Sequence, residues 1–220
     1  PDDFELDLRT ELTVDSTAVA DYLLRTAGAG LLGSLALPAS IRPSQLRRDM
    51  ATIGFYRNKA NAADPTKFFR KPDSSRVNIE SSSAGFFRFK PTDGSCELLR
   101  FDSPFKTVNP KLRESYPKQR RNMKAVAQYW RHDSGPRPTI CVIHGFMADP
   151  YWLNRLFFAL PWFYDQGYDI LLYTLPHHGR RQSRFSPFSG HGLFAGGLSH
   201  LNESMAHAVQ RCRGPCQQTS

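Results

Sequence analysis

The sequence is poor in cysteine, and the cysteines it has form no recognisable framework. Its 220 residues include four, Cys96, Cys141, Cys212 and Cys216. Cys141 lies within an apolar segment, where a small buried thiol is expected. Cys212 and Cys216 form a C-x3-C pair, but no second pair completes a zinc site. We therefore predict no metal and no other cofactor. Nothing in this pattern requires an oxidising compartment, so we expect a cytoplasmic location.

The sequence also lacks an apolar run long enough to cross a membrane. The best candidate, residues 27–38 (AGAGLLGSLALP), has 12 residues, whereas a spanning helix needs about 20. The residues before it are mostly acidic, unlike the basic start of a secretory signal. We predict a buried or interfacial helix here and no transmembrane segment.

Charge is unevenly distributed along the chain, whose net charge is +9. Residues 2–15 hold six acidic side chains and one Arg, whereas residues 106–131 hold eight basic side chains and only Glu114. The basic stretch could attract phosphates, an anionic substrate or, as a peripheral contact, an anionic surface; the alternative is an ordinary solvated face. No nucleic-acid-binding motif accompanies it, so we expect no specific nucleic-acid partner.

The first 94 residues predict helices and an irregular connection. Ser16 is a suitable cap for a helix over 13–37, and a weaker helix is expected over 44–59. Residues 60–94 are rich in Pro, Ser, Asp and Lys, which favours an irregular segment. We therefore divide the chain into an N-terminal helical extension with an irregular linker (1–94), a core (95–210) and a disordered tail (211–220).

The core shows the pattern of an α/β fold. Strands are predicted over 96–101, 123–131, 139–144 and 168–175, and the last two are apolar almost without alternation, as in a parallel sheet covered on both faces. Asp149 and Pro150 are typical of a helix start between them, which makes a βαβ unit.

Apolar residues predict the buried faces of the two core helices. Between the third and fourth strands, the expected buried stripe consists of Leu153, Leu156, Phe157 and Leu160. In a final amphipathic helix it consists of Leu198, Leu201, Met205 and Val209.

Three features in this order resemble the α/β-hydrolase family. A buried strand runs into His144-Gly145-Phe146, a helix begins at Asp149-Pro150, and the strand YDILLYTL is followed by PHHGRR, residues 176–181. The last segment is similar to the family's Pro-Gly-His-Gly-Arg, with His177 where the family usually has Gly. The resemblance covers about half the chain and implies a partial α/β-hydrolase-type sheet of strands 1–4 with helices, preceded by the helical extension.

The resemblance also implies a role for the loop after the third strand. In such hydrolases this loop supplies one backbone N–H of the oxyanion hole, which stabilises the negative oxygen formed during ester or acyl cleavage. The candidates are Gly145, Phe146 and Met147, with the N–H of Phe146 first and that of Met147 second. The alternative is that His144-Gly145 only turns the chain into the next helix.

The histidines do not fit the remaining catalytic roles. In the family the nucleophile precedes the acid and the base, but His144 and His178 precede the place of the nucleophile. We expect them to hydrogen-bond within loops. A metal site built from His177, His178 and His191 is a further alternative, but no carboxylate partners are evident.

The sequence contains no Gly-x-Ser-x-Gly elbow. Its nearest approach, Gly197-Leu198-Ser199, lacks the second glycine and is expected to begin the last helix. We therefore predict no catalytic residue in the chain and interpret it as an incomplete serine esterase-like hydrolase for a small ester or acyl substrate, inactive alone. The alternative function is a non-catalytic binding or scaffold protein that uses a basic surface. Without a fifth strand, the third would form an apolar edge, and the isolated fold would be marginal.

Overall fold

The computed structural model describes residues 15–23, 25–27, 29–30, 43–58, 63–64, 66, 69, 77–85 and 88–212. The chain forms two compact units, Pro1–Arg42 and Pro43–Ser220. In the first, every described residue is helical, as predicted for 13–37. Residues 31–38 of the apolar segment and the expected tail from 213 onward lie outside the described residues. No helix in the described part of the chain is long and apolar enough to span a bilayer.

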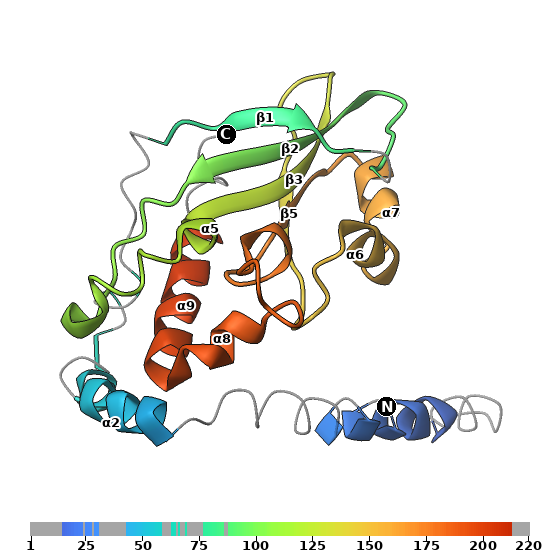
Figure 1. Ribbon diagram of the computed structural model, residues 1–220. Helices are drawn as coiled ribbons and strands as arrows, with labels where there is room; N and C mark the ends of the chain where they lie inside the picture. Colours follow the sequence, from blue (N-terminus) through green and yellow to red (C-terminus); the bar gives the residue numbers. More distant parts are fainter. Residues whose placement is uncertain are drawn as a thin grey trace. The chain divides into compact units, whose positions relative to one another are not determined.

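The second unit is built on a five-stranded mixed sheet (Figure 1). The strand order is β1-β2-β3-β5-β4. Adjacent strands are antiparallel except β4 and β5, which are parallel. The strands are β1 (Glu80–Ser83), β2 (Gly94–Asp102), β3 (Lys124–His132), β4 (Thr139–Ile143) and β5 (Asp169–Tyr173).

Four of these strands confirm the predicted ones, and the fold class is α/β. β2, β3, β4 and β5 correspond to the strands expected over 96–101, 123–131, 139–144 and 168–175. Their order places the third predicted strand beside the fourth and at the edge of the described sheet, as expected from the sequence for a sheet without a fifth strand. The irregular segment expected over 60–94 is corrected in one place, because β1 lies within it and pairs with β2.

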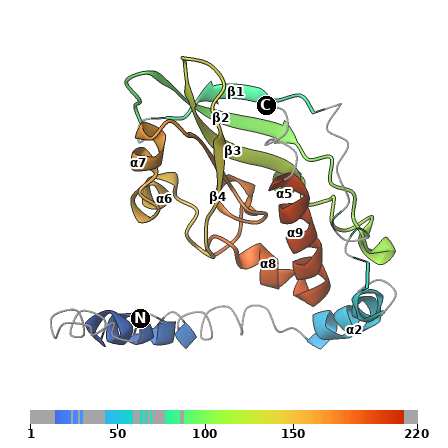
Figure 2. The same ribbon diagram turned by 180° about the vertical axis from the view of Figure 1, so that it is seen from behind.

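Helices and short 3-10 turns connect the strands. α6 and α7 lie on one side of β5 and β4, and α5 and α9 lie on the other (Figures 1 and 2). The helical elements of this unit are α2 (Pro43–Arg57), η1 (Pro110–Leu112), α5 (Arg120–Met123), α6 (Tyr151–Phe157), α7 (Leu160–Asp165), η2 (Gly179–Arg181), α8 (His191–Ala195) and α9 (Gly197–Cys212). α2 confirms the weaker helix predicted over 44–59.

The core lies on both faces of β5, all of whose residues are buried. Alternation along the strand sends Ile170 and Leu172 to one face, where Trp130 of β3 and Leu160 and Tyr164 of α7 surround them. Leu171 and Tyr173 point to the other face; with them are Phe101, Ala125, Ala127 and Tyr129. Burial on both faces explains why residues 170–173 (ILLY) lack polar alternation.

The helix after β4 differs from the prediction in its start and its buried face. Asp149 makes no cap; the N-cap position belongs to Pro150, without a side-chain hydrogen bond. The helix also breaks at Ala159, whose φ is +46°, and α7 restarts with Pro161 in its first turn. The break changes which residues face the sheet: Leu160 is buried, but Leu156 is 65% and Phe157 77% exposed.

The buried face of α9 is also not the predicted one. Leu198 and Met205 of the expected apolar stripe are 53% and 58% exposed. The helix instead buries four polar side chains: Ser199, Glu203, Ser204 and His207. These positions recur every three or four residues, so they form one helical face. The amphipathic period was detected, but the wrong face was assigned to the core.

The two edges of the sheet differ in character. β1 is short and its four residues, ESSS, are all exposed. β4 has the sequence TICVI and, within the described part of the chain, pairs only with β5. A short polar edge resists pairing with another molecule, whereas an apolar edge with free N–H and C=O groups invites it.

We expect β4 to drive self-association. Ile143 lies at the end of this edge and is 46% exposed. The substitution Ile143→Lys should lower the fraction of dimers and larger species, because a charge opposes strand addition. Sedimentation velocity measures that fraction. Ser82→Lys adds the same charge to β1 and should leave the fraction of dimers and larger species unchanged. Equal effects of the two substitutions would contradict the role of β4.

Candidate functional site

The loop after β4 forms a tight turn with two accessible amides. The N–H of Ala148 donates to the carbonyl oxygen of Gly145 at 3.1 Å, and Met147 has a φ of +60°. A positive φ at the third residue is the signature of a type II-like turn. In the described part of the chain, the N–H groups of Phe146 and Met147 have no hydrogen-bond partner.

Aromatic packing holds this turn against the segment that follows β5. The Phe146 ring packs edge-on against His178, with centroids 5.6 Å apart, and against Phe194 at 5.3 Å. Gly190, with a φ of +89°, allows the approach: a Cβ there would be 2.5 Å from Phe146 Cε2 and 2.6 Å from His178 Nε2. The position of the turn therefore depends on residues more than 30 positions downstream.

His144 joins the loops after β4 and β5. Its Nδ1 lies 2.8 Å from the carbonyl oxygen of Gly145, and its Nε2 accepts from the N–H of Leu175 at 3.0 Å. Nδ1 therefore carries the proton and donates it to Gly145. Burial lowers the pKa of His144 below its usual range. As predicted, this histidine hydrogen-bonds within loops.

His178 is fully buried, and only one of its two ring nitrogens has a hydrogen-bond partner among the described residues. Its Nδ1 lies 2.9 Å from the carbonyl oxygen of Pro176, while its Nε2 has no partner among the described residues. Burial lowers the pKa of His178 to about 4, so the ring is neutral at pH 7. His178 is thus a buried neutral ring that holds Phe146.

Arg181, the last residue of η2, is fully buried without a carboxylate beside it. Nε and one terminal nitrogen donate to the carbonyl oxygen of Asn122 at 3.2 and 2.7 Å. The other terminal nitrogen donates to the hydroxyl of Tyr173 at 2.6 Å and the carbonyl of Thr174 at 2.9 Å. His207 Nε2, 3.1 Å away, takes the fifth bond. All five guanidinium N–H groups are therefore used.

Glu203 is a second buried ionisable side chain, but its hydrogen bonds go to groups other than Arg181. Its carboxylate accepts from the backbone N–H groups of Val108 and Asn109, each at 2.8 Å, and from the hydroxyl of Tyr56 at 2.6 Å. Burial raises the pKa of Glu203. Glu203 joins α9 to α2 and to the segment before η1, and it explains part of the polar face of α9.

His177 adopts a backbone conformation that favours glycine. Its φ is +64°, which strains any residue with a Cβ. The family to which the segment is similar usually has Gly at this position, and the geometry explains that preference. The backbone N–H of His177 donates to Asn122 Oδ1 at 2.9 Å, and its Nε2 lies 3.2 Å from Asn122 Nδ2 and 3.0 Å from Ser204 Oγ.

The contact between Ser204 and His177 is not a nucleophile–base pair. Ser204 is 1% exposed, so a substrate has no access to its hydroxyl. His177 Nε2 accepts from the Asn122 amide, and no carboxylate among the described residues orients the ring. Burial, and then the nearby charge of Arg181, lowers the pKa of His177 to about 3, too low for a base at neutral pH.

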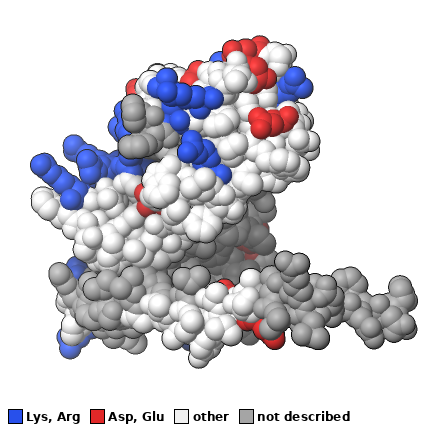
Figure 3. All heavy atoms as spheres, turned by 90° about the vertical axis from the view of Figure 1, so that its right-hand side faces the viewer, with Lys and Arg blue, Asp and Glu red and all other residues white. Residues whose placement is uncertain are grey.

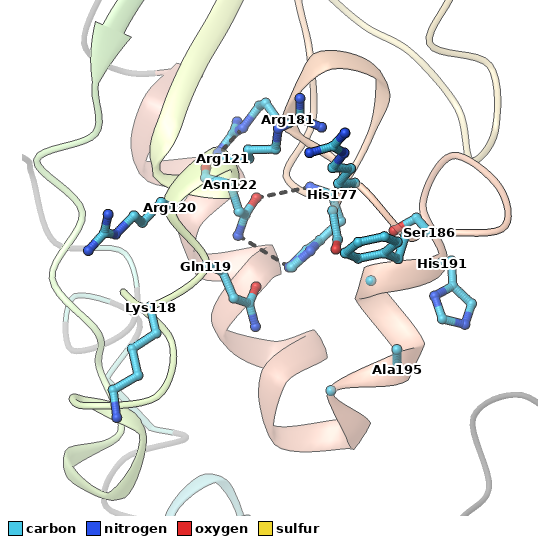
Figure 4. Close-up of a pocket in the computed structure, with 15 residues that line it drawn as sticks. Lys118, Gln119, Arg120, Arg121, Asn122, His177, Arg181, Ser186, His191 and Ala195 are labelled. Carbon is cyan, nitrogen blue, oxygen red and sulfur yellow. Dashed lines mark hydrogen bonds between the residues drawn. The ribbon is translucent and has the colours of Figure 1, made fainter.

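A cavity of about 560 Å³ lies beside these residues. Its wall is formed by 118–122 around α5, by His177 and 181–186, and by 191–196 around α8. Figure 4 shows Lys118 and Arg120 on the opposite side of this space from His191 and Ala195. His177 and His191 both line it, but no group of three metal-ligating side chains occurs in the described part of the chain.

Comparisons with known proteins include a weak structural similarity. No protein-family model matches the chain, and no curated protein does. Among solved structures, acetyl xylan esterase 1 from Thermoanaerobacterium sp. JW/SL YS485 aligns with a TM-score of 0.40 and 13% identity. The alignment covers 66% of this chain and 41% of that one.

The sequence predictions identified the loops of this region but missed its buried polar residues. Gly145, Phe146, Met147, His144 and His178 all lie at the ends of β4 and β5. The sequence did not indicate that four polar side chains are buried here: Asn122, Arg181, Glu203 and His207. Only the spacing of Glu203 and His207, one helical turn apart, could have indicated a polar buried face.

Replacing His177 should separate backbone strain from side-chain contacts. His177→Gly and His177→Ala both remove the imidazole and its bonds to Asn122 and Ser204, but only Gly relieves the positive φ. We expect His177→Gly to be the more stable of the two by about 1 kcal/mol, as measured by urea unfolding. Equal stabilities would contradict the conformation of this residue.

Stability should fall as the solution is acidified below neutral pH. The pKa is lowered to about 3 for His177 and about 4 for His178 in the folded chain, against about 6.5 when unfolded. Between these values the unfolded chain binds more protons, so each histidine contributes a slope of up to about 1.4 kcal/mol per pH unit. Glu203, with its raised pKa, acts in the opposite sense.

Urea unfolding of the chain and of His177→Gln at pH 7, 6 and 5 tests this. The free energy of unfolding should decrease toward pH 5 in the unsubstituted chain and less steeply in the variant. A parallel decrease in both would contradict the neutral state of His177.

Proposed function

We propose that the chain forms the oxyanion-loop part of a serine-type ester or acyl hydrolase. The N–H of Phe146, or failing that of Met147, donates to the oxygen that becomes negative when a small ester or acyl substrate is attacked. The observation that carries the proposal is the turn at Gly145–Ala148, whose two inner amides have no partner in the described part of the chain.

The place of the turn supports this role. It follows the carboxyl end of β4, the parallel strand at the sheet edge, and ligands of open α/β sheets bind at the carboxyl ends of the strands. Gly145 has no neighbouring atom within 4 Å of where a Cβ would stand. A substrate carbonyl can therefore approach the backbone closely.

The chain itself supplies the oxyanion donor but no nucleophile. Its sequence contains no Gly-x-Ser-x-Gly, and Ser204 is buried. In the proposed enzyme the serine lies on a strand that pairs with the open edge of β4, which brings it to the same end of the sheet as Phe146. The acid and the base lie beyond that strand. The 220 residues alone are therefore inactive.

The decisive experiment is to read and express the coding sequence downstream of Ser220. The proposal requires a Gly-x-Ser-x-Gly within about one strand and turn. A serine-directed fluorophosphonate should label the extended chain and not the 220 residues. An extended chain without the motif and without labelling would overturn the proposal.

Within the extended chain, Phe146→Pro and Phe146→Ala test the amide. Both remove the ring that packs on His178, but only Pro removes the N–H. Proline is favoured at the second position of a type II-like turn, so the turn persists. We expect kcat for p-nitrophenyl acetate in Phe146→Pro to be lower than in Phe146→Ala by about 10²–10³-fold. Equal values would exclude the N–H of Phe146.

A further inference from the structure

The cavity between α5 and α8 has the size and place of a small-molecule site. Its volume of about 560 Å³ lies within the roughly 300–1,000 Å³ typical of such sites. It opens at the carboxyl end of β5, where His177 and Arg181 follow the strand. Its wall joins residues 118–122 to residues more than 50 positions downstream, between 177 and 196, so only the folded chain forms it.

Its lining carries positive charge and no negative charge. Five of its residues are basic: Lys118, Arg120, Arg121, Arg181 and Arg184. Among the described residues that line it, there is no Asp or Glu. Figure 3 shows that Lys and Arg gather on part of the surface of this unit too, and the cavity places five of them around one open depression. A cleft lined by one sign of charge focuses its field and attracts the opposite sign.

The exposed cations of the cavity have no partner among the described residues. Side chains of Lys118, Arg120, Arg121 and Arg184 make no ion pair or hydrogen bond within the described part of the chain. Arg181 differs, because all five of its N–H groups are already used. It therefore adds charge to the wall, whereas the other four have donors available for a ligand.

Two polar atoms of the lining are buried without a partner. These are Gln119 Oε1 and Ser186 Oγ, which have no hydrogen bond among the described residues. The amide nitrogen of Gln119 lies 3.1 Å from His200 Nδ1, which fixes its oxygen as the free end. Unpaired buried polar atoms are rare in folded proteins and call for a partner. Both atoms are shielded from the open space of the cavity, so they add to the polarity of its wall without facing a ligand.

His177 supplies a neutral donor. Asn122 Oδ1 accepts from the backbone N–H of His177, so the Asn122 amide nitrogen faces the ring and donates to Nε2. The proton of the neutral ring therefore sits on Nδ1. Gly192 lies against Nδ1, and a Cβ there would collide with it. Both residues line the cavity, and the missing Cβ of Gly192 is what allows this close packing against the ring.

We infer that the cavity binds a small molecule that carries a phosphate or carboxylate group. The oxyanion group contacts the guanidinium groups of Arg120, Arg121 and Arg184, which suit either anion. This site functions whether or not the chain is part of a hydrolase.

Calorimetric titration of the full chain tests the site, with pyrophosphate and citrate as separate probes at low salt. One of the two should bind saturably, and the better probe identifies phosphate or carboxylate as the preferred group. Binding should weaken as NaCl is added. The double variant R120Q/R121Q should reduce the affinity by about tenfold or more. Both side chains are exposed, so its melting temperature should not change.

The matched control is K106Q/R113Q, which removes the same two charges from exposed positions that do not line the cavity. It should change the affinity by less than about twofold.

Three results would overturn the inference. If the two double variants lost the same amount of affinity, binding would depend on the overall charge of the chain and not on the cavity. The absence of saturable binding by both probes would exclude the site. Binding to vesicles of anionic phospholipid, without binding to either soluble probe, would assign the basic residues to a membrane surface. None of these measurements involves ester cleavage, so their failure is distinct from failure of the proposed function.

Discussion

The buried guanidinium of Arg181 is the constraint on which this part of the fold depends. Its five hydrogen bonds reach the carbonyl of Asn122 in α5, the end of β5 at Tyr173 and Thr174, and His207 in α9. An arginine stays charged in the interior, so each lost partner would leave a buried donor unpaired at high cost. The guanidinium therefore fixes α5 and α9 relative to the end of the sheet.

The polar face of α9 follows from the same constraint. His207 faces Arg181, Ser204 faces His177, and Glu203 receives backbone N–H groups from Val108 and Asn109. Each of these groups needs a partner that an apolar side chain lacks. The helix consequently turns its hydroxyl, carboxylate and imidazole groups inward and leaves Leu198 and Met205 exposed.

Strained backbone marks the two loops that carry the proposed functions. Met147 and His177 have φ values of +60° and +64°, and each follows a neighbouring parallel strand. At Met147 the conformation leaves the amides of the turn accessible. At His177 it directs an imidazole toward Asn122 and the cavity. Residues held in sparsely populated conformations cluster at functional sites because surrounding contacts maintain them.

The four main strands, the βαβ unit and the loop at Gly145 could all be predicted from the sequence. These depend on local patterns, since apolar runs bounded by Gly and Pro specify a buried strand and its end wherever they occur. The position of β4 at the edge was predicted from the sheet order of the family that the sequence resembles. The local patterns failed at Leu156 and Phe157, because a break at Ala159 changes the helix face and no periodicity reveals it.

Only the tertiary structure decided which face of α9 is buried and that a cavity exists. An apolar stripe normally predicts the core, but here Arg181 and the backbone N–H groups of Val108 and Asn109 require polar partners, and those lie about 20 to 100 residues away along the chain. The cavity likewise joins residues 118–122, 177–186 and 191–196. Contacts between such distant residues leave no local signature, which is why the buried charges became visible only in the fold.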